Sequence, residues 1–442
     1  MSAKRILIIS PCPGEGAGAE IVLEELLQAW DFPELQLVLL APEGSRIHRA
    51  ANKKRFEWYN LPVEKKGLHL SDNLRAVKAA RKAVPKCDRV HAWTIRVFPA
   101  VEWLSCQWDV PASGTLHDNP FSRKIHGPVL WDMRGMNLRS LRDWRERVWC
   151  TQELVLRTWW RWQWAYRAAS RFDQLVCVSE AVRRECERKG YQSKLSVIRN
   201  GIADQPVPER GLSDKVRIGF LGMEYPQRKG FSIVEQWIPR LGGSVLWKLY
   251  GNASGRTLKR LETGNQRSED RGQKTEDRSQ RAEVGGQRSE VRQGQTGNFS
   301  ASGRSAGGGN DFNEYGDATI STSGTPRFFE YMGECPREKI FREIDILVHT
   351  STLFDPLPTV LIEAARAGIP CIASSNGGAA EIVEDGISGL LFDPAYPGEG
   401  LEKMKRLLDP DLRDEMGTKA RKIFEKRFQV ERMVGEYIGV LV

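Results

Sequence analysis

Two carboxylates and a predicted helix start stand close together in one segment of the sequence. Asp355 lies in a predicted loop, and a helix opens after a proline at Thr359 and Val360. The first amides of a helix lack partners within it, and its dipole adds partial positive charge, so this end can hold a phosphate. Glu363, one turn in, is placed to accept hydrogen bonds from the vicinal hydroxyls of a ribose, and Asp355 from sugar hydroxyls. The segment therefore predicts a site for a phosphorylated sugar.

Two glycines, Gly16 and Gly18, follow a short β-branched run over 5–10. An amphipathic stretch with apolar residues at helical spacing covers 21–30, and a second apolar run covers 35–40. Strand, glycine loop, helix and strand form a βαβ unit, which implies a parallel sheet.

The remaining apolar runs fall into two series. The first continues with predicted strands over 89–92, 112–116 and 174–178. The second has predicted strands over 216–221, 245–250, 345–349 and 370–373, with a helix over 359–367. Because 442 residues are too many for one ordinary core, the two series predict two doubly wound domains, separated near 203–213. We expect domains over 1–205 and 206–425, with a helix over 426–442 returning to the first domain.

The segment 255–324 fits neither series. Its centre repeats with a seven-residue period but has no apolar residues at coiled-coil positions, and a stretch rich in Gly, Ser and Asn follows. Such a composition buries too little apolar surface to offset the loss of chain entropy on folding. We therefore predict a disordered insertion within the second domain.

Five segments resemble, in the right order, the motifs of one enzyme family. Asp355 and Glu363 match an acidic-x7-Glu motif, and Gly222 with Lys229-Gly230 resembles a GR…KG loop. Residues 172–182 resemble D-x-x-x-x-V-S-E-x-V, 197–202 resemble V-I-x-N-G-V, and 377–391 resemble GG-x-x-E…DG-x-x-G-L-L. Each motif alone is weak, but five in order are specific. Outside 255–324, the sequence resembles the family 4 (group 1) retaining glycosyltransferases, which adopt the GT-B fold.

This resemblance implies an architecture and a donor site. The architecture is α/β, with two Rossmann-like doubly wound domains facing each other across a cleft. The donor, a UDP- or GDP-sugar, would lie mostly on the C-terminal domain. Its implied contacts are Glu363 with the ribose, Lys229 and Arg228 with the diphosphate, and Gly222, Thr359 and Val360 around them.

The resemblance also implies which residues face the transferred sugar. Asp355 would contact that sugar, and His117 in Thr115-Leu-His-Asp118 resembles a histidine that faces it; with Glu363 they are the predicted catalytic residues. Gly16 and Gly18 would approach the phosphates or the acceptor. The implied reaction retains the anomeric configuration, needs no metal or cofactor, and passes the sugar to a glycan or lipid-linked acceptor.

Two positions depart from the family pattern. Asp355 stands where the family usually has Glu, and Met223 where it usually has Arg. One extra residue before Lys229 brings in Arg228, which would supply the missing positive charge. These changes bear on donor affinity more than on the fold.

Composition limits compartment and cofactor. No run reaches the ~18–20 apolar residues that a spanning helix needs, and no signal peptide is recognised. The eight cysteines form no C-x-x-C pair and have no histidines at zinc-ligand spacing, so we expect reduced thiols, a cytoplasmic location and no metal. Asp409-Pro-Asp411 resembles a metal motif, but its surroundings favour a turn between helices. Gly14, Gly16 and Ala19 fit a dinucleotide fingerprint only formally, because Gly14 stands too far behind the strand.

Tryptophan and arginine gather over 131–167. The net charge of the chain is +9, and the stretch from Arg123 to Arg171 holds seven of the 14 tryptophans. Three interpretations stay open for this segment: a helix on an anionic membrane face, which would make the protein peripheral to the cytoplasmic membrane, a clamp for a sugar acceptor, or a partly buried hairpin. Nucleic-acid binding is not expected, because the tryptophans are bunched and no nucleic-acid motif accompanies them.

Three functions remain as hypotheses. The first is a transferase, the second a GT-B relative that only binds a nucleotide-sugar, and the third a nucleotide-sugar epimerase of the same fold. On residue type alone, Glu363 could be a solvated helix carboxylate, Lys229 a surface lysine and His117 a core histidine. The flanking motifs favour the transferase.

Overall fold

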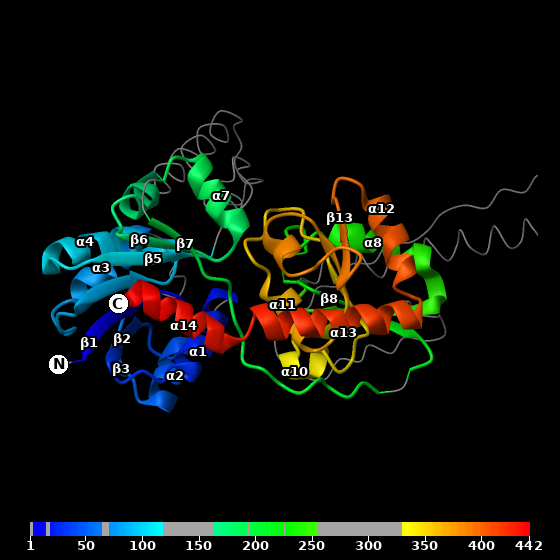
Figure 1. Ribbon diagram of the computed structural model, residues 1–442, viewed down its shortest axis with the longest axis horizontal. Helices are drawn as coiled ribbons and strands as arrows, with labels where there is room; N and C mark the ends of the chain where they lie inside the picture. The colour runs from blue at the N-terminus through cyan, green and yellow to red at the C-terminus, as the bar shows by residue number, and fades with distance from the viewer. Residues whose placement is uncertain are drawn as a thin grey trace, which may run out of the picture. The chain divides into compact units, whose positions relative to one another are not determined.

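The computed structural model describes residues 3–14, 18–63, 70–117, 163–191, 194–211, 213–224, 226–253 and 329–442. Within these ranges the fold is α/β, with two parallel sheets (Figure 1). Both sheets belong to one unit formed by Met1–Ala253 and Phe329–Val442. The predicted insertion over 255–324 lies outside the described residues.

The first sheet is built from short strands, of which the central ones are buried on both faces. Its order is β3 (Glu57–Asn60), β2 (Leu35–Ala41), β1 (Lys4–Ile9), β4 (Arg89–Ala92), β5 (Ala112–Leu116), β6 (Gln174–Cys177) and β7 (Lys194–Val197), all parallel. The four residues Ile6 to Ile9 are all buried, as a parallel sheet covered by helices on both faces requires. The strand order reverses between β1 and β4, which is where open α/β sheets bind ligands at the carboxyl ends of their strands.

Helices cover this sheet on both faces. They are α1 (Gly18–Ala29), α2 (Arg46–Lys54), α3 (Leu70–Ala80), α4 (Phe98–Trp108) and α7 (Glu180–Arg188), with a 3-10 turn η1 (Ile95–Val97). The predicted apolar stripe of α1 is confirmed at Leu23, Leu26 and Leu27, which are buried in one core, whereas Ile21 is half-buried and Val22 is buried in its place. The last helix, α14 (Val430–Leu441), adds Met433 and Tyr437 to the same core and lies beside α1 (Figure 1).

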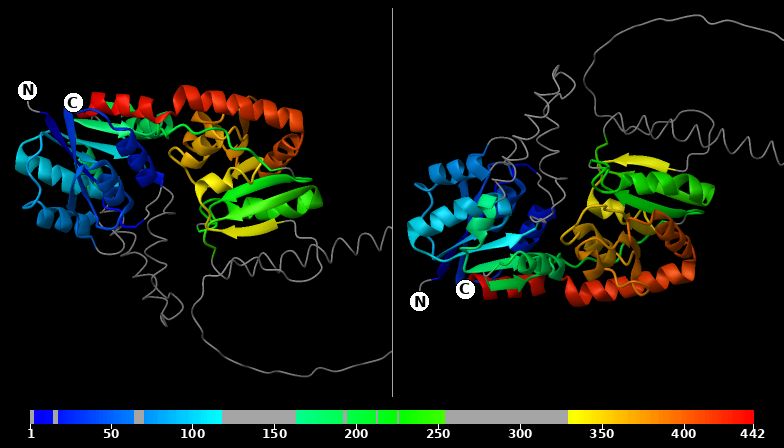
Figure 2. Two further views of the ribbon diagram at one scale, coloured as in Figure 1. Left: turned by 90° about the horizontal axis from the view of Figure 1, so that it is seen from below. Right: turned by 90° about the horizontal axis from the view of Figure 1, so that it is seen from above.

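The second sheet repeats the same arrangement. Its order is β10 (Phe329–Gly333), β9 (Val245–Tyr250), β8 (Val216–Leu221), β11 (Ile346–His349), β12 (Cys371–Ser374) and β13 (Gly389–Phe392), again all parallel. Figure 2 shows β10, in yellow, at the edge of the sheet beside the green strands β8 and β9, although 254–328 comes between β9 and β10 in the chain. The order reverses between β8 and β11.

The helices of the second sheet are α8 (Phe231–Leu241), α10 (Arg337–Ile340), α11 (Thr359–Arg366), α12 (Pro397–Arg406) and α13 (Pro410–Arg427), with 3-10 turns η2 (Gly242–Ser244) and η3 (Gly378–Glu381). Asp409 is the N-cap of α13, and its carboxylate accepts a hydrogen bond from the Leu412 amide at 2.9 Å. A capping role therefore accounts for the Asp-Pro-Asp sequence at this helix start.

Two chain segments that connect the sheets are bonded to each other. Ile202 pairs with Gln429 as an isolated bridge: the Ile202 amide donates to Phe428 O at 3.0 Å, and the Val430 amide donates to Ile202 O at 3.1 Å. A Cβ at Gly201 would lie 2.6 Å from Gln429 O, so only glycine allows this approach. The domain boundaries predicted at 205 and 425 fall near this bridge and stay predictions.

Candidate functional site

Polar side chains gather after β8 and β11, where the order of the second sheet reverses. Lys229 comes from the loop between β8 and α8, His349 is the last residue of β11, and Asp355 lies in the loop before α11. Lys229 Nζ lies 3.2 Å from Asp355 Oδ2. His349 Nε2 lies 3.4 Å from the same oxygen but is not aligned for a hydrogen bond. The structure thus joins two predicted site residues and adds a buried histidine.

The ionised form of Asp355 is favoured by these neighbours. Burial alone would raise the pKa of this carboxyl, but the Lys229 ammonium and then the His349 ring outweigh it, so the net shift is far below the usual range. Asp355 therefore stays a carboxylate at neutral pH. In that state it can accept hydrogen bonds from sugar hydroxyls.

Two glycines fix the Lys229 loop against β11. Gly222 has a φ of +144°, and a Cβ there would lie 2.7 Å from Lys229 Cγ. Gly230 has a φ of +72°, and a Cβ there would lie 1.8 Å from Thr350 O. Thr350 Oγ1 is 3.0 Å from both Lys229 O and Gly230 O. The lysine stem is therefore held on a backbone that has little room to shift.

Glu363 is buried on α11 and forms an ion pair. Its Oε2 accepts a hydrogen bond from Arg337 Nη1 at 2.7 Å. Burial raises the pKa of this carboxyl, and although Arg337 and then Arg366 oppose that effect, the net shift is upward. The solvated helix-face carboxylate weighed above is therefore wrong for Glu363, because the residue is only 4% exposed.

A second acidic residue, Glu25 of α1, stands near Glu363. Glu25 Oε2 accepts a hydrogen bond from the Ala203 amide at 2.9 Å, and Arg366 Nη1 donates to Ala203 O at 3.0 Å. Burial raises the pKa of Glu25, and the negative charge of Glu363 adds to that effect. Glu363 of α11 therefore has both positively and negatively charged neighbours rather than basic ones alone.

The start of α11 is free of a side-chain cap. Its N-cap is Pro358, which makes no side-chain hydrogen bond, and Thr359 and Val360 are half-buried. A Cβ at Gly18, the first residue of α1, would lie 3.4 Å from Thr359 Oγ1. The first residue of α1, which ends the predicted glycine loop, therefore lies next to the first residue of α11, the helix predicted to hold the phosphate. Gly16, the other glycine of that loop, lies outside the described residues.

His117 follows β5 at the carboxyl edge of the first sheet. Its ring centroid lies 5.0 Å from that of Trp93, and burial lowers the pKa of the imidazole to about 3. Within the described ranges, Nε2 is buried and has no hydrogen-bond partner. The neutral ring therefore presents one unpaired nitrogen. The satisfied core histidine weighed above does not fit this nitrogen.

The two departures from the family pattern have different surroundings. Met223 is fully buried, and its amide donates to Tyr250 O at 3.0 Å, so this side chain serves packing. Arg228 is exposed, and among the described residues its guanidinium forms no ion pair. Arg228 is therefore free to meet an anion, whereas position 223 cannot.

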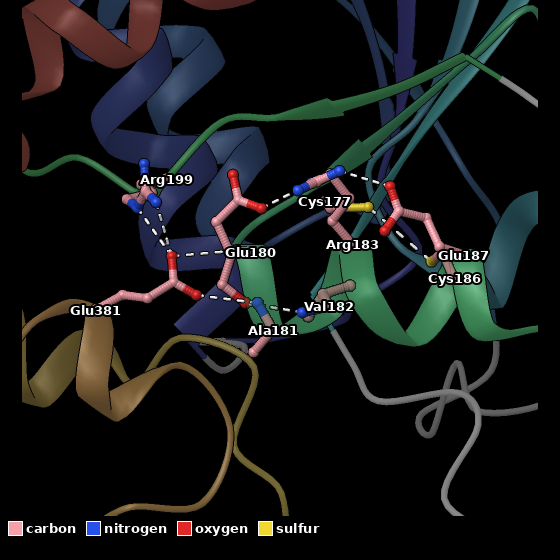
Figure 3. A network of polar contacts seen from close by, with 10 residues as sticks. Cys177, Glu180, Ala181, Val182, Arg183, Cys186, Glu187, Arg199 and Glu381 are labelled. Atoms are coloured by element: carbon pink, nitrogen blue, oxygen red, sulfur yellow. Dashed lines mark hydrogen bonds and ion pairs between the residues drawn. The ribbon is translucent and has the colours of Figure 1, made fainter.

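Glu381 of η3 binds the start of α7 (Figure 3). Its carboxylate accepts hydrogen bonds from the Glu180 amide at 3.1 Å and the Ala181 amide at 3.0 Å. Arg199 Nε donates to Glu381 Oε2 at 2.9 Å. A carboxylate at a helix N-terminus meets both the unpaired amides and the positive end of the dipole. The family motif that contains Glu381 therefore links the second sheet to a helix of the first.

Several of these partners are not predicted by the sequence motifs. They are Arg337, His349 and Arg199, although His349 has a usable signal as a polar residue at the carboxyl end of a predicted strand. Glu381 was identified only as part of a motif. Arg337 and Arg199 gave no signal, because each partner is distant in the chain.

Some predictions fall outside the described residues. They include Gly16, the insertion over 255–324 and most of the tryptophan-rich segment 131–167. In the part of the chain that is described, no helix is long and apolar enough to cross a membrane. That part also holds no group of three or more His, Cys, Asp or Glu side chains that could bind a metal ion.

Comparisons with known proteins agree on one family. The model "Glycosyltransferase Family 4" matches residues 16–205, and "Glycosyl transferases group 1" matches residues 317–423. The N-acetyl-alpha-D-glucosaminyl L-malate synthase of Bacillus anthracis is 33% identical over 79 residues, which are 18% of this chain and 21% of that protein. Spore coat protein SA of Bacillus subtilis is 28% identical over 115 residues, which are 26% of this chain and 30% of that protein. The matches thus span less than a third of each relative.

A solved structure covers the whole fold. HepE of Anabaena, in complex with UDP and glucose, has a TM-score of 0.67 and 16% identity, and the match covers 99% of this chain and 98% of HepE. This likeness shows that the two parallel Rossmann-like sheets form a GT-B fold, as predicted. The two family models, which match 16–205 and 317–423, show that the chain belongs to the group 1 glycosyltransferases of family 4.

Proposed function

We propose that the chain is a retaining, metal-independent glycosyltransferase that moves a sugar from a nucleoside-diphosphate sugar to a glycan or lipid-linked acceptor. The observation that carries the proposal is the Lys229–Asp355 pair at the strand reversal of the second sheet, in the loops that lead to α8 and α11. Ligands of such sheets bind at that place. HepE, which has the same fold, is described in complex with UDP, so UDP-sugars come first among the donors to test, with GDP-sugars next.

In this proposal the positive groups hold the diphosphate. Lys229 and Arg228 would face its oxygens, and the amides at Thr359 and Val360 would add hydrogen bonds from the start of α11. As the bond to the leaving nucleotide breaks, negative charge grows on the diphosphate. Cations and amides aimed there therefore stabilise the transition state more than the ground state.

The remaining residues would place the two sugars of the donor. Glu363 would bind the ribose, and Asp355 with His117 would contact the transferred sugar. Gly18 leaves room for the phosphates beside Thr359, because a side chain there would meet the Thr359 hydroxyl. The leaving diphosphate itself would take the proton of the incoming hydroxyl.

A panel of UDP-, GDP- and ADP-sugars tests the donor. Thermal stabilisation by one nucleotide class, with turnover that is lost in Glu363→Ala while the fold is kept, supports the transferase. Stabilisation without turnover in the wild-type chain indicates a protein that only binds the nucleotide-sugar. A changed sugar without an acceptor in product analysis indicates an epimerase.

We also propose that the tryptophan-rich segment 131–167 contacts an anionic membrane face that carries a lipid-linked acceptor. Flotation with anionic liposomes tests this part separately. Protein that floats with anionic but not with neutral liposomes supports it. Protein that stays at the bottom of both gradients contradicts it.

A further inference from the structure

Among the described residues, Arg337 makes the closest polar contact to the buried carboxylate of Glu363. Arg337 Nη1 lies 2.7 Å from Glu363 Oε2, and the side chains are 41% and 5% exposed, respectively. The short helix α10 follows the edge strand β10 in the chain and carries this arginine, and the buried residues Ile340 and Phe341 anchor it in the core. The guanidinium therefore reaches in from a fixed backbone while part of it stays in contact with solvent.

No other cation does the same for Glu363 among the described residues. Arg366 lies on the same helix and favours the charged carboxylate, but its Nη1 is committed to Ala203 O at 3.0 Å. Glu338 of α10 and Glu25 of α1 carry negative charges that oppose ionisation of Glu363. With two acidic neighbours and nearly complete burial, the carboxylate depends on Arg337.

The contact uses only one oxygen of the carboxylate. Arg337 binds Oε2, and within the described ranges Oε1 of Glu363 makes no hydrogen bond. A carboxylate can accept about four hydrogen bonds in all, so the pair leaves acceptor capacity at Oε1. We infer that Arg337 is a positioning residue that holds Glu363 through Oε2 and turns Oε1 to the vicinal hydroxyls of the donor ribose.

This inference rests on the proposed function, because it names how the donor's ribose is recognised. Both hydroxyls must donate, so the carboxylate has to be ionised to accept from both. Without Arg337, burial and the acidic neighbours would raise the pKa of Glu363 further, and more of it would be protonated at neutral pH. Ribose recognition would then weaken at low pH and recover as the pH rises.

Nucleotide binding by calorimetry tests the inference. The probes are UDP, GDP and ADP, and the tightest of them is then compared with its 2′-deoxy counterpart. We expect Arg337→Gln to weaken the ribonucleotide about tenfold near neutral pH, which is the effect of losing one charge-assisted contact. In Arg337→Gln, the preference for the ribonucleotide over the deoxynucleotide should shrink near neutral pH and should return at about pH 8.5. Arg337→Lys should keep more of that preference, because it keeps the charge.

Arg342→Gln is the matched control, since it removes the same charge from an exposed position five residues further on. Equal affinity of Arg337→Gln and Arg342→Gln at every pH overturns the inference. So does an equal loss for the ribo- and the deoxynucleotide, which would point to a general role of Arg337. A wild-type chain that binds none of the three nucleotides overturns the proposed function and this inference with it. If the wild-type chain binds one of the nucleotides and Arg337→Gln binds it with unchanged affinity, the inference is overturned and the proposed function is not.

Discussion

Lys229 Nζ and Asp355 Oδ2 lie 3.2 Å apart, although 126 positions separate the two residues in the chain. The lysine predicted for the diphosphate thus has an acidic partner before any donor is bound. Because the Asp355 side chain is only 17% exposed, removing either partner leaves a poorly hydrated charge. This pair therefore links donor binding to the stability of the second sheet.

Lys229→Ala should weaken binding of the donor nucleotide about 10- to 100-fold, because one charge-assisted contact to the diphosphate is lost. Calorimetric titration with UDP, or with the nucleotide that the panel selects, measures this. Lys215→Ala is a suitable control, because that lysine is exposed and its ammonium has no acidic partner among the described residues. Unchanged affinity in Lys229→Ala would remove this residue from the donor site.

Asp355→Asn should lower the free energy of unfolding by about 1–3 kcal/mol at neutral pH, since the half-buried Lys229 loses its countercharge. The pKa of Asp355 is lowered in the folded chain. Its ionised form therefore stabilises the fold above the unfolded value of about 3.9, and that contribution is lost as the pH falls toward the folded pKa. Urea unfolding of both chains should show the gap narrowing below about pH 4. A gap that widens in acid would refute this explanation.

Glu363→Gln should lower kcat/KM by about 100-fold while the chain stays at least as stable as the wild type. The stability argument follows from the raised pKa, because a buried acid that resists ionisation costs free energy above its unfolded pKa. A neutral amide of similar shape avoids that cost. Thermal unfolding and steady-state kinetics measure the two effects, with Glu334→Gln at an exposed position as control. Full activity in Glu363→Gln would reject the predicted site.

Gly18→Val should lower kcat/KM at least about tenfold by filling the space between α1 and α11. A Cβ at Gly18 would already be in van der Waals contact with Thr359 Oγ1 at 3.4 Å, so the two further methyl groups of valine would take up space beside the start of α11 where the phosphates are proposed to bind. Gly435→Ala in α14 is the control, because a Cβ there meets nothing within 4 Å and should stabilise the helix by about 0.5–1 kcal/mol. If Gly18→Val turns over the donor normally, the two helix starts do not share a ligand.

Arg199→Ala and Glu381→Ala should be non-additive in unfolding free energy, with a coupling of about 1 kcal/mol for a partly exposed pair. Glu381→Ala should cost more than Arg199→Ala, because it also removes the acceptor of the Glu180 and Ala181 amides. Denaturant unfolding of the two single variants and the double variant completes the cycle. Additive effects would show that the contact in Figure 3 contributes nothing to stability.

The interior of both sheets was predictable, and their edges were not. The predicted strands correspond to β1, β2, β4, β5, β6, β8, β9, β11 and β12. The strands without a prediction are β3, β7, β10 and β13, and each stands at the edge of its sheet. An edge strand has one free side and needs no continuous apolar run, as the half-buried side chains of β3 and β7 show.

The candidate site was predictable where a motif sets the spacing along the chain. The helix start at Thr359 and the buried Glu363 follow from local sequence. The position of Arg337 does not follow from local sequence, because 254–328 interrupts the chain before β10, the strand that leads to α10, and α10 has only four residues. Ion pairs between distant segments depend on how strands are ordered in a sheet, and side-chain type alone does not reveal that order.

Because Ile202 and Gln429 form a bridge, the two chain segments that connect the sheets are coupled and must move together. A displacement of either segment is therefore transmitted to the other through the two backbone hydrogen bonds that join them. Any side chain at Gly201 would clash with Gln429 O and push the two connecting segments apart. A substitution there would therefore disturb the connection between the sheets without touching Lys229 or Glu363.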